Sequence, residues 1–244
     1  MGENLIPRLR QVDLMPIKYE EQDLFLLRDQ QGLAPEPLLL SPASVHLLRF
    51  FDGQHTVDDM QLELTRMSGQ IVPREQLGAF VEKLDEAFFL DSPRFARRQQ
   101  DYAEEYAAAP HRPVRFAGEA YPADPAALRH ELNALYEAPG GPGAPKPVTT
   151  WPRAIAAPHI DIRRGAAVYA HAYQTLWASA PERIVVLGVC HAPAPNPFIL
   201  TVKDYATPLG VMPVDRELIR SLMAKLDWNP LEAQELHRAE HSIE

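Results

Sequence analysis

The chain has 244 residues, 46% of them hydrophobic, which is enough to fill one large domain or two smaller ones. Its formal net charge of −9 argues against a nucleic-acid partner, because binding to a phosphate backbone requires clustered Lys and Arg. No run approaches the roughly 18 apolar residues of a membrane span, and the N-terminus lacks the pattern of a signal peptide. We therefore expect a cytoplasmic protein with no membrane partner.

The cysteine content limits the kind of metal site that the chain can form. Cys190 is the single cysteine, which excludes an internal disulfide and a zinc site made of several thiolates. A metal ion must therefore rest mainly on histidine and carboxylate ligands.

Residues 1–91 predict a small α+β unit. Residues 25–27 and 37–40 have the pattern of two short strands in a hairpin. Three helices follow, and their expected starts are Ser41-Pro42, Thr56 with Asp59, and Pro73. Residues 89–91 would form a closing strand.

Three helices with flanking strands predict a winged-helix-like domain, a shape that usually suggests DNA binding. Residues 1–91 hold eight basic and sixteen acidic residues, a net charge of −8, which instead favours a peptide partner or packing on a neighbouring domain. The order of hydrophobic and turn positions resembles the PqqD-like domains, which implies recognition of a peptide added as an edge strand. The alternative is a helical packing module with no ligand.

Residues 92–111 are charged and Ala-rich and predict a linker helix, after which a second domain covers residues 112–244. Asp124 and Asp215 are each expected to cap a helix with leucines on one face. Residues 198–202 are a plausible strand between these helices.

Residues 155–192 have the pattern strand, loop, helix, strand, with His159 and His191 just after the two strands. Parallel strands joined by a crossover helix place their carboxyl ends side by side, at the edge where open α/β sheets bind ligands. The sequence therefore predicts that two imidazoles meet at one crevice.

Five short motifs follow one another in residues 112–244. They are Phe116-Ala-Gly118 with Tyr121-Pro122, Ala157-Pro158-His159, Leu187-Gly188 with His191, Thr207-Pro208-Leu209-Gly210, and Glu240-His241-Ser242-Ile243-Glu244. In this order they resemble the Memo family, known in bacteria as AmmeMemoRadiSam system protein B.

The resemblance implies an α/β fold, the αβ sandwich of class III extradiol dioxygenases, with a central mixed sheet. It also implies bound Fe(II) or copper, redox chemistry, and radical SAM and AMMECR1-like proteins as partners. His159 and His191 would be metal ligands. His241 would be a catalytic acid/base, or a group that hydrogen-bonds one of the metal-ligating residues. The family's third ligand would follow Glu244, so the Memo-like domain is expected to lack its C-terminal part.

The chain departs from the family pattern at both histidines. His159-Ile-Asp161-Ile stands where His-Ala-Gly-Tyr is usual, and Cys190-His191-Ala192 where Ser-His-His is common. Asp161 could ligate the metal or orient an imidazole. If His191 faces the crevice, alternation along a strand turns Cys190 into the core.

Other charged residues near these motifs leave two interpretations open. Glu240 and Glu244 could be solvated or could hold the His241 ring. Arg163 and Arg164 could bind an anionic substrate, although such a pair is more often solvated at a helix start.

These observations favour a metal-dependent oxidoreductase or dioxygenase-like protein, and a peptide presented by the first domain is its expected substrate. The alternative is a non-catalytic binding or adaptor protein that retains the Memo fold. A purely structural metal site is less favoured, because both ligands sit at a sheet edge suited to substrates.

Overall fold

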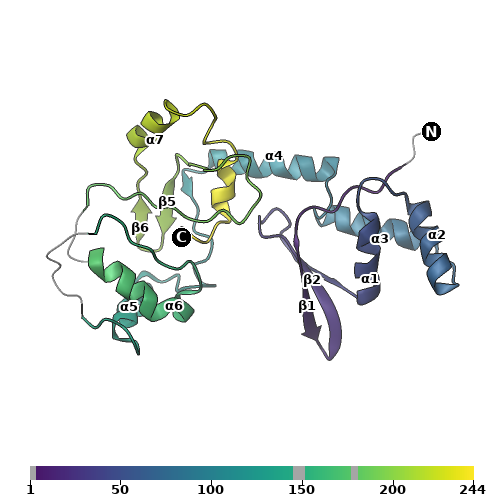
Figure 1. Ribbon diagram of the computed structural model, residues 1–244, viewed down its shortest axis with the longest axis horizontal. Coiled ribbons are helices and arrows are strands. Elements are labelled where there is room, and N and C mark those ends of the chain that lie inside the picture. Colours follow the sequence, from purple (N-terminus) through teal and green to yellow (C-terminus); the bar gives the residue numbers. More distant parts are fainter. Residues whose placement is uncertain (1–3, 145–151, 177–180) are drawn as a thin grey trace. The chain divides into compact units, whose positions relative to one another are not determined.

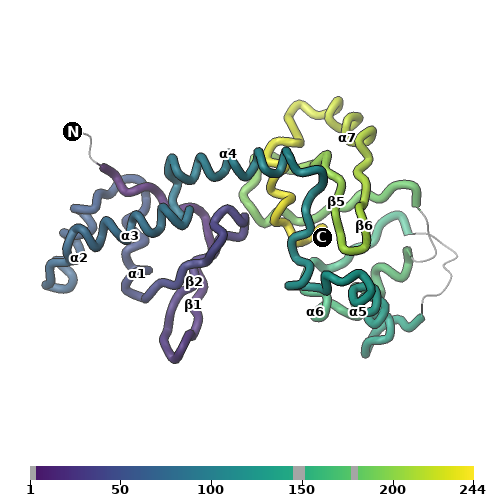
Figure 2. The backbone as a smooth tube through the Cα atoms, turned by 180° about the vertical axis from the view of Figure 1, so that it is seen from behind, coloured from purple at the N-terminus to yellow at the C-terminus, as the bar shows by residue number. Residues whose placement is uncertain are grey.

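The structure, a computed structural model, describes residues 4–144, 152–176 and 181–244. It divides into two compact units, residues 1–107 and residues 108–244, and Figures 1 and 2 trace the chain through them. The described part is a mixed α/β fold with seven α-helices and two three-stranded sheets. Within it, no helix is long and apolar enough to cross a membrane.

The sheet of the first unit is antiparallel, in the order β1 (Asp13–Tyr19), β2 (Gln22–Arg28), β3 (Leu38–Leu40). The predicted hairpin is confirmed, since Leu26 lies opposite Leu39 in the register of β2 and β3. Strand β1 has no counterpart among the predicted elements. It contains Pro16, which weakens the signal for a strand, but proline is tolerated at an edge and β1 is an edge strand.

The helices of the first unit start where the sequence predicts. They are α1 (Pro42–Leu47), followed by a short 3₁₀ helix (Leu48–Phe50), α2 (Val57–Ser68) and α3 (Arg74–Glu86). The Ser41 hydroxyl caps α1 by accepting from the Ser44 backbone N–H. Thr56 and Asp59 form the predicted capping box of α2, and each satisfies a backbone N–H of the other.

One apolar core holds the first unit together. Its buried members come from the N-terminal segment, the sheet and the helices: Ile6, Leu27, Ala34, Leu40, Phe50, Phe51, Met60, Leu77, Leu84, Phe89 and Leu90. Residues 89–91 do not form the predicted closing strand, because only an isolated bridge joins Leu90 to Leu9. The side chains of Phe89 and Leu90 are instead buried in the apolar core.

The predicted helix over residues 92–111 is present as α4 (Pro93–Ala108). Its Phe95 and Tyr102 side chains pack with Leu33 of the first unit. Most of α4 therefore belongs to the first unit, and the division between the two units falls near the C-terminal end of this helix.

The second unit is built around a small mixed sheet. Strand β4 (His111–Arg112) pairs in parallel with β5 (Asp204–Thr207), which pairs antiparallel with β6 (Gly210–Met212). The helices are α5 (Pro125–Glu137), α6 (Ile162–Tyr173) and α7 (Arg216–Met223), with 3₁₀ turns at Gln174–Leu176 and Gln234–Arg238. Helices α5 and α6 contact each other and lie apart from α7 (Figure 1). Asp124 and Asp215 cap α5 and α7 as predicted.

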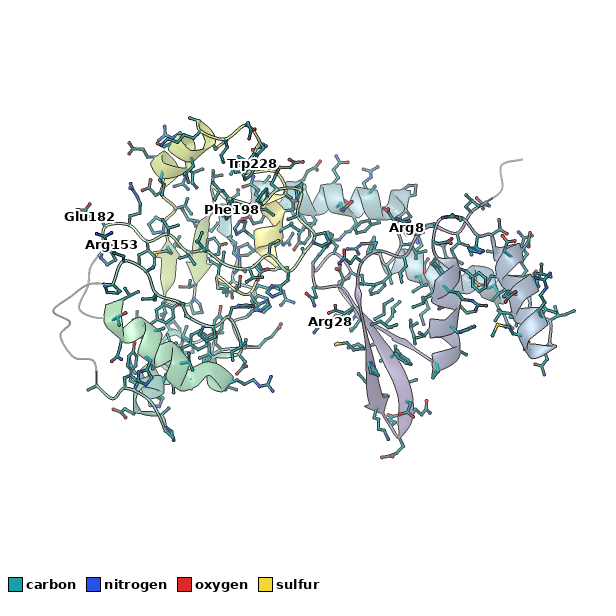
Figure 3. All side chains as sticks on the ribbon, viewed as in Figure 1. Arg8, Arg28, Arg153, Glu182, Phe198 and Trp228 are labelled. Carbon is teal, nitrogen blue, oxygen red and sulfur yellow. The ribbon has the colours of Figure 1, made fainter. Side chains whose placement is uncertain are left out.

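Three strands predicted for the second unit are wrong. Residues 155–159, 184–190 and 198–202 contain no strand, and Phe198, labelled in Figure 3, is 63% exposed. The backbone of residues 184–188 makes no hydrogen bond to any described residue. A strand requires a neighbouring strand to satisfy its N–H and C=O groups. The apolar run from Ile184 to Val189 has no such neighbour among the described residues, so it has no regular structure and stays exposed.

Candidate metal centre

Three histidines from distant parts of the sequence lie together in the second unit. His159, His191 and His241 each offer a ring nitrogen, and these nitrogens all lie within 4.8 Å of one another. The ring centroids are separated by 5.3 Å for His159 and His191, 5.7 Å for His159 and His241, and 4.4 Å for His191 and His241. The predicted meeting of His159 and His191 is thus present without the two strands that were expected to produce it.

Helix α6 sets the position of His159. Asp161, two residues later, is the N-cap, and its carboxylate accepts from the backbone N–H groups of Arg163 at 2.9 Å and Arg164 at 3.1 Å. The Tyr169 hydroxyl donates to the Ile160 carbonyl at 2.7 Å, which ties the residue after His159 to the helix. Two kinds of contact therefore fix the segment that leads into α6: the Asp161 side chain caps the helix, and Tyr169 binds the backbone carbonyl of Ile160.

Glu240 sets the orientation of His191. Its carboxylate accepts from the His191 ring Nδ1 at 3.0 Å and from the His191 backbone N–H at 3.1 Å. An ionised carboxylate only accepts hydrogen bonds, so Nδ1 must carry the proton and Nε2 is left as the nitrogen that can bind a metal. The same carboxylate lies 3.6 Å from Nδ1 of His241.

The electrostatics favour an ionised Glu240. Burial acts to raise the pKa of Glu240, but donors from the Ser242 backbone and from the backbone and ring of His191 outweigh it. The net effect holds the pKa of Glu240 below its ordinary value, so this carboxylate stays negative next to the histidines.

The segment after Glu240 packs closely on the segment before His191. The Ser242 hydroxyl accepts from the Val189 N–H and donates to the Val189 carbonyl, both at 2.9 Å. Gly188 permits the approach, because a Cβ there would lie 2.6 Å from Ser242 Oγ and would overlap the Ile243 side chain. A larger residue at position 188 would push this segment away.

A buried ion pair anchors the last residues. The Arg112 guanidinium pairs with the Glu244 carboxylate, and their side chains are 0% and 1% exposed. Glu244 also accepts from the Tyr121 hydroxyl and from the Phe116 backbone N–H, the latter at 2.9 Å. Burial acts to raise the pKa of Glu244, but the hydrogen bonds from Tyr121, Arg112 and Phe116 outweigh it. The pKa of Glu244 is therefore held below its ordinary value, and the carboxylate remains charged.

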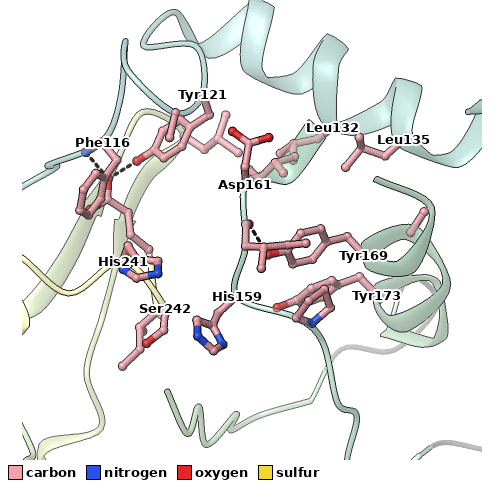
Figure 4. Close-up of a pocket in the computed structure, with 18 of the residues that line it drawn as sticks. Phe116, Tyr121, Leu132, Leu135, His159, Asp161, Tyr169, Tyr173, His241 and Ser242 are labelled. Atoms are coloured by element: carbon pink, nitrogen blue, oxygen red, sulfur yellow. Dashed lines mark hydrogen bonds between the residues drawn. The ribbon is translucent and has the colours of Figure 1, made fainter. Parts of the chain in front are cut away.

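A cavity of about 850 Å³ opens beside the histidines. Figure 4 shows Phe116, Tyr121 and His241 on one side of it, Tyr169 and Tyr173 on the other, and His159 between them. Most of the remaining lining is apolar and comes from α5, α6 and the ends of loops: Leu132, Leu135, Ile160, Ile162, Leu209 and Ile243. His159 and His241 therefore face a space that suits a small apolar molecule.

Several sequence interpretations now have a structural answer. Asp161 lines the cavity but is the cap of α6, and the three-histidine cluster does not include it. Arg163 pairs with Glu131 on α5 in an exposed contact, which matches the interpretation of a solvated helix start. The expected burial of Cys190 is wrong, because the residue is exposed and no strand alternation operates there.

The sequence did not single out Arg112 as important. Its partners Glu240 and Glu244 lie some 130 residues away, and no spacing rule links an arginine to carboxylates at that separation. The two glutamates were named, with solvation or contact to His241 as the options, but their main partners are His191 and Arg112.

A family model described as "Memo-like protein" matches residues 112–244, which is more than half of the chain. The chain belongs to the Memo family. Within this family, the MEMO1 family protein of Aquifex aeolicus is 30% identical over 238 residues, covering 98% of this chain and 60% of the relative. The MEMO1 family protein of Thermus thermophilus is 28% identical over 190 residues, covering 78% and 56%. The memo-1 homolog of Caenorhabditis elegans is 33% identical over 93 residues, covering 38% and 26%.

The chain spans no more than 60% of the length of these three relatives. Its similarity to the Aquifex protein extends over nearly the whole chain and so includes the first unit. No solved structure matches the chain.

Proposed function

We propose that His159, His191 and His241 bind one Fe(II) or copper ion and that this Memo family member is a metal-dependent oxidoreductase of dioxygenase-like type. The observation that carries the proposal is the convergence of three imidazoles, from three separate segments, on one place beside a cavity. Imidazole is a good ligand for iron and copper. When bound, such an ion would supply one-electron or oxygen chemistry that no side chain of this site provides.

The hydrogen bonds around the cluster support this donor set. Histidines that ligate a metal almost always donate their other ring nitrogen to a carboxylate, a carbonyl or water, which fixes the tautomer. The contact between His191 Nδ1 and Glu240 has this form. Three protein ligands also leave coordination positions for a substrate, which is typical of catalytic sites rather than structural ones.

The cavity supplies the binding energy for the substrate. Phe116, Tyr169 and Tyr173 present aromatic faces that would hold an apolar body and exclude water from the histidines. His241, whose ring lines the cavity, would in addition be the acid/base that hydrogen-bonds a bound substrate.

Metal analysis of protein purified without oxygen tests the ligand set. We expect about one equivalent of iron or copper in the wild type and a loss of most of it in the His159→Ala, His191→Ala double variant. His171→Ala is the matched control, because this imidazole bonds the Gly140 carbonyl outside the cluster. Equal metal content in the wild type and the double variant would overturn the assignment.

Oxygen consumption separates an enzyme from a binding protein. Metal-loaded protein that consumes oxygen with an apolar substrate would support catalysis. A loaded protein that binds such molecules in the cavity without ever consuming oxygen would support the non-catalytic binding or adaptor function.

A peptide-binding role for the first unit is a second candidate. Strands β1 and β3 are the two edges of its sheet, and an edge strand can accept an added peptide strand. This edge fits the proposed likeness of residues 1–91 to a PqqD-like, winged-helix-like domain. Titration of the chain with peptides encoded near its gene tests the idea. A Lys18→Pro variant, which removes a β1 backbone N–H on the side away from β2, where Pro16 already lacks one, should weaken any binding at that edge.

Family membership also suggests a place in an AmmeMemoRadiSam system, with this chain as protein B and radical SAM and AMMECR1-like proteins as partners. Co-expression of the three proteins followed by size-exclusion chromatography tests this. Separate elution at micromolar concentration would count against a stable complex.

A further inference from the structure

The segment from Glu240 to Glu244 carries much of the site, yet it has no regular secondary structure. It contains His241, the Glu240 carboxylate that holds His191, and the Ser242 hydroxyl that bonds Val189. A helix or strand would fix such a segment through its own hydrogen-bond ladder. Here the fixing contacts must come from elsewhere in the unit.

Arg112, on β4, provides those contacts. Its Nε donates to the His237 carbonyl at 2.9 Å, its Nη2 donates to the Glu240 carbonyl at 2.8 Å, and its Nη1 pairs with the Glu244 carboxylate. Three nitrogens of one guanidinium thus reach three acceptors spaced along residues 237–244. The planar fork of arginine can do this, whereas the single ammonium of lysine cannot.

The Arg112 guanidinium is buried, so every one of its hydrogen-bond donors needs a partner within the protein. Arg112 is 0% exposed, and its guanidinium carbon Cζ lies 5.3 Å from the centroid of the Tyr205 ring. A charge removed from water in this way is tolerated only when it is paired and hydrogen-bonded. Glu244 meets that condition with donors from Tyr121 and from the backbone of Arg115 and Phe116, in addition to Arg112.

We propose that Arg112 is a positioning residue for the three-histidine site. In the part of the chain that the structure describes, no hydrogen bond joins Arg112 to the three rings. It fixes the Glu240 carbonyl just before His241 and the Glu244 carboxylate three residues after it. In this way it places His241 in the cluster and aims Glu240 at the His191 ring. The inference rests on the proposed function in so far as the histidines are taken as metal ligands.

Tyr121 extends the same network to the cavity. Its hydroxyl donates to Glu244, and both residues line the cavity wall with Phe116. Burial and the neighbouring carboxylate raise the pKa of Tyr121, so the phenol stays protonated as a donor. Removing this hydroxyl leaves the Arg112 ion pair in place and gives a milder change to the same network.

The test compares Arg112→Lys and Tyr121→Phe with the control Arg183→Lys, which alters an exposed ion pair with Asp215 in the same unit. Co²⁺ is titrated into each metal-free protein and followed by visible absorption. We expect the Co²⁺ dissociation constant to rise about tenfold or more in Arg112→Lys, and severalfold in Tyr121→Phe. In the control it should stay within about twofold of the wild type.

A second readout does not depend on metal. Nitrogen NMR of the metal-free protein at mildly alkaline pH reports the His191 tautomer, which Glu240 should hold with the proton on Nδ1 in the wild type. We expect mixed tautomers in Arg112→Lys while far-ultraviolet circular dichroism shows that the protein is still folded. A merely structural role would lower thermal stability without moving either the tautomer or the Co²⁺ affinity of the folded protein.

The outcomes separate the two ideas. An unchanged tautomer and an unchanged Co²⁺ affinity in folded Arg112→Lys would overturn the role of Arg112. If wild-type protein binds no Co²⁺, the proposed metal function fails, and the tautomer measurement still decides on Arg112. If Arg112→Lys does not fold, the same two readouts on Tyr121→Phe decide instead.

Discussion

Glu240 is the residue that most affects how the histidine cluster can bind a metal. It holds Nδ1 of His191, lies near Nδ1 of His241, and is kept ionised by its donors in spite of partial burial. The His191 ring therefore presents Nε2 as its metal-binding atom, and the His241 ring is stacked next to it. The negative charge beside them also favours a cation there.

Replacing Glu240 by Ala should weaken metal binding more than it weakens the fold. Because the His191 ring would lose its orientation and its fixed tautomer, we expect affinity for Co²⁺ or Fe(II) to fall by about 10- to 100-fold. Calorimetric titration measures this. Glu217→Ala, which removes an exposed carboxylate from the first turn of α7, is the control and should bind as the wild type does.

His237 makes the stability of the second unit sensitive to acid. Its Nε2 donates to the Ile199 carbonyl, so Nδ1 is left to accept from the Tyr205 hydroxyl. Burial lowers the pKa of His237, the Ile199 carbonyl acts to raise it, and the charge of Arg112 lowers it further. Below about pH 6.5 the unfolded chain therefore takes up a proton that the folded protein resists.

We predict that the free energy of unfolding falls between about pH 7.5 and pH 5.5, by at most about 1.4 kcal/mol per pH unit from this residue. His237→Gln should lose less over the same range. Urea unfolding followed by tryptophan fluorescence measures both proteins. Glu240 and Glu244, with lowered pKa values, lose their contribution only at lower pH, so equal losses in both proteins would contradict the role of His237.

At the scale of elements, the sequence predicted what is local and missed what depends on distant partners. The caps Ser41, Thr56, Asp124 and Asp215 are correct because a cap involves residues only two or three positions apart. The strand over residues 184–190 failed because its β-branched composition expresses a preference that only a neighbouring strand can satisfy.

The candidate site divides in the same way. His159, His191 and His241 were identified from motifs, whereas the role of Arg112 could not be, since it depends on contacts across more than 120 residues. Asp161 was interpreted as a possible ligand because it follows His159 closely, and its helix-capping geometry became visible only with α6 in place.

Two substitutions separate the capping role of Asp161 from a ligand role. Asn also caps helices well, so Asp161→Asn should keep both the stability and the metal affinity of the wild type. Asp161→Ala should cost about 1 kcal/mol of stability. Loss of metal from the Asn variant, measured by elemental analysis, would show that the carboxylate is itself a ligand.

At the scale of the whole molecule, the two units are stabilised differently. The clusters of buried apolar side chains found among the described residues belong to the first unit. The second unit relies on buried polar contacts around Arg112 and leaves large apolar side chains exposed, with Leu187 at 80%. The chain covers 60% of the length of its Aquifex relative, over an alignment that includes both units.

Because the apolar core lies in the first unit and the second unit is held by other contacts, we predict that the two units unfold separately. Leu84 is 0% exposed in the core of the first unit, so Leu84→Ala should destabilise that unit by about 2–5 kcal/mol. All three tryptophans follow residue 107, so tryptophan fluorescence reports on the second unit. We expect its unfolding midpoint to stay unchanged while the circular-dichroism midpoint of the first unit falls. A parallel drop in both would show that the units unfold together.

X-ray absorption spectroscopy of Fe(II)-loaded protein tests the central claim most directly, because it reports the atoms bound to the metal. We predict a nearest shell with the multiple-scattering pattern of three imidazoles, reduced to one in the His159→Ala, His191→Ala double variant. A shell of oxygen atoms alone, identical in the wild type and the variant, would contradict the assignment of His159, His191 and His241 as the metal site.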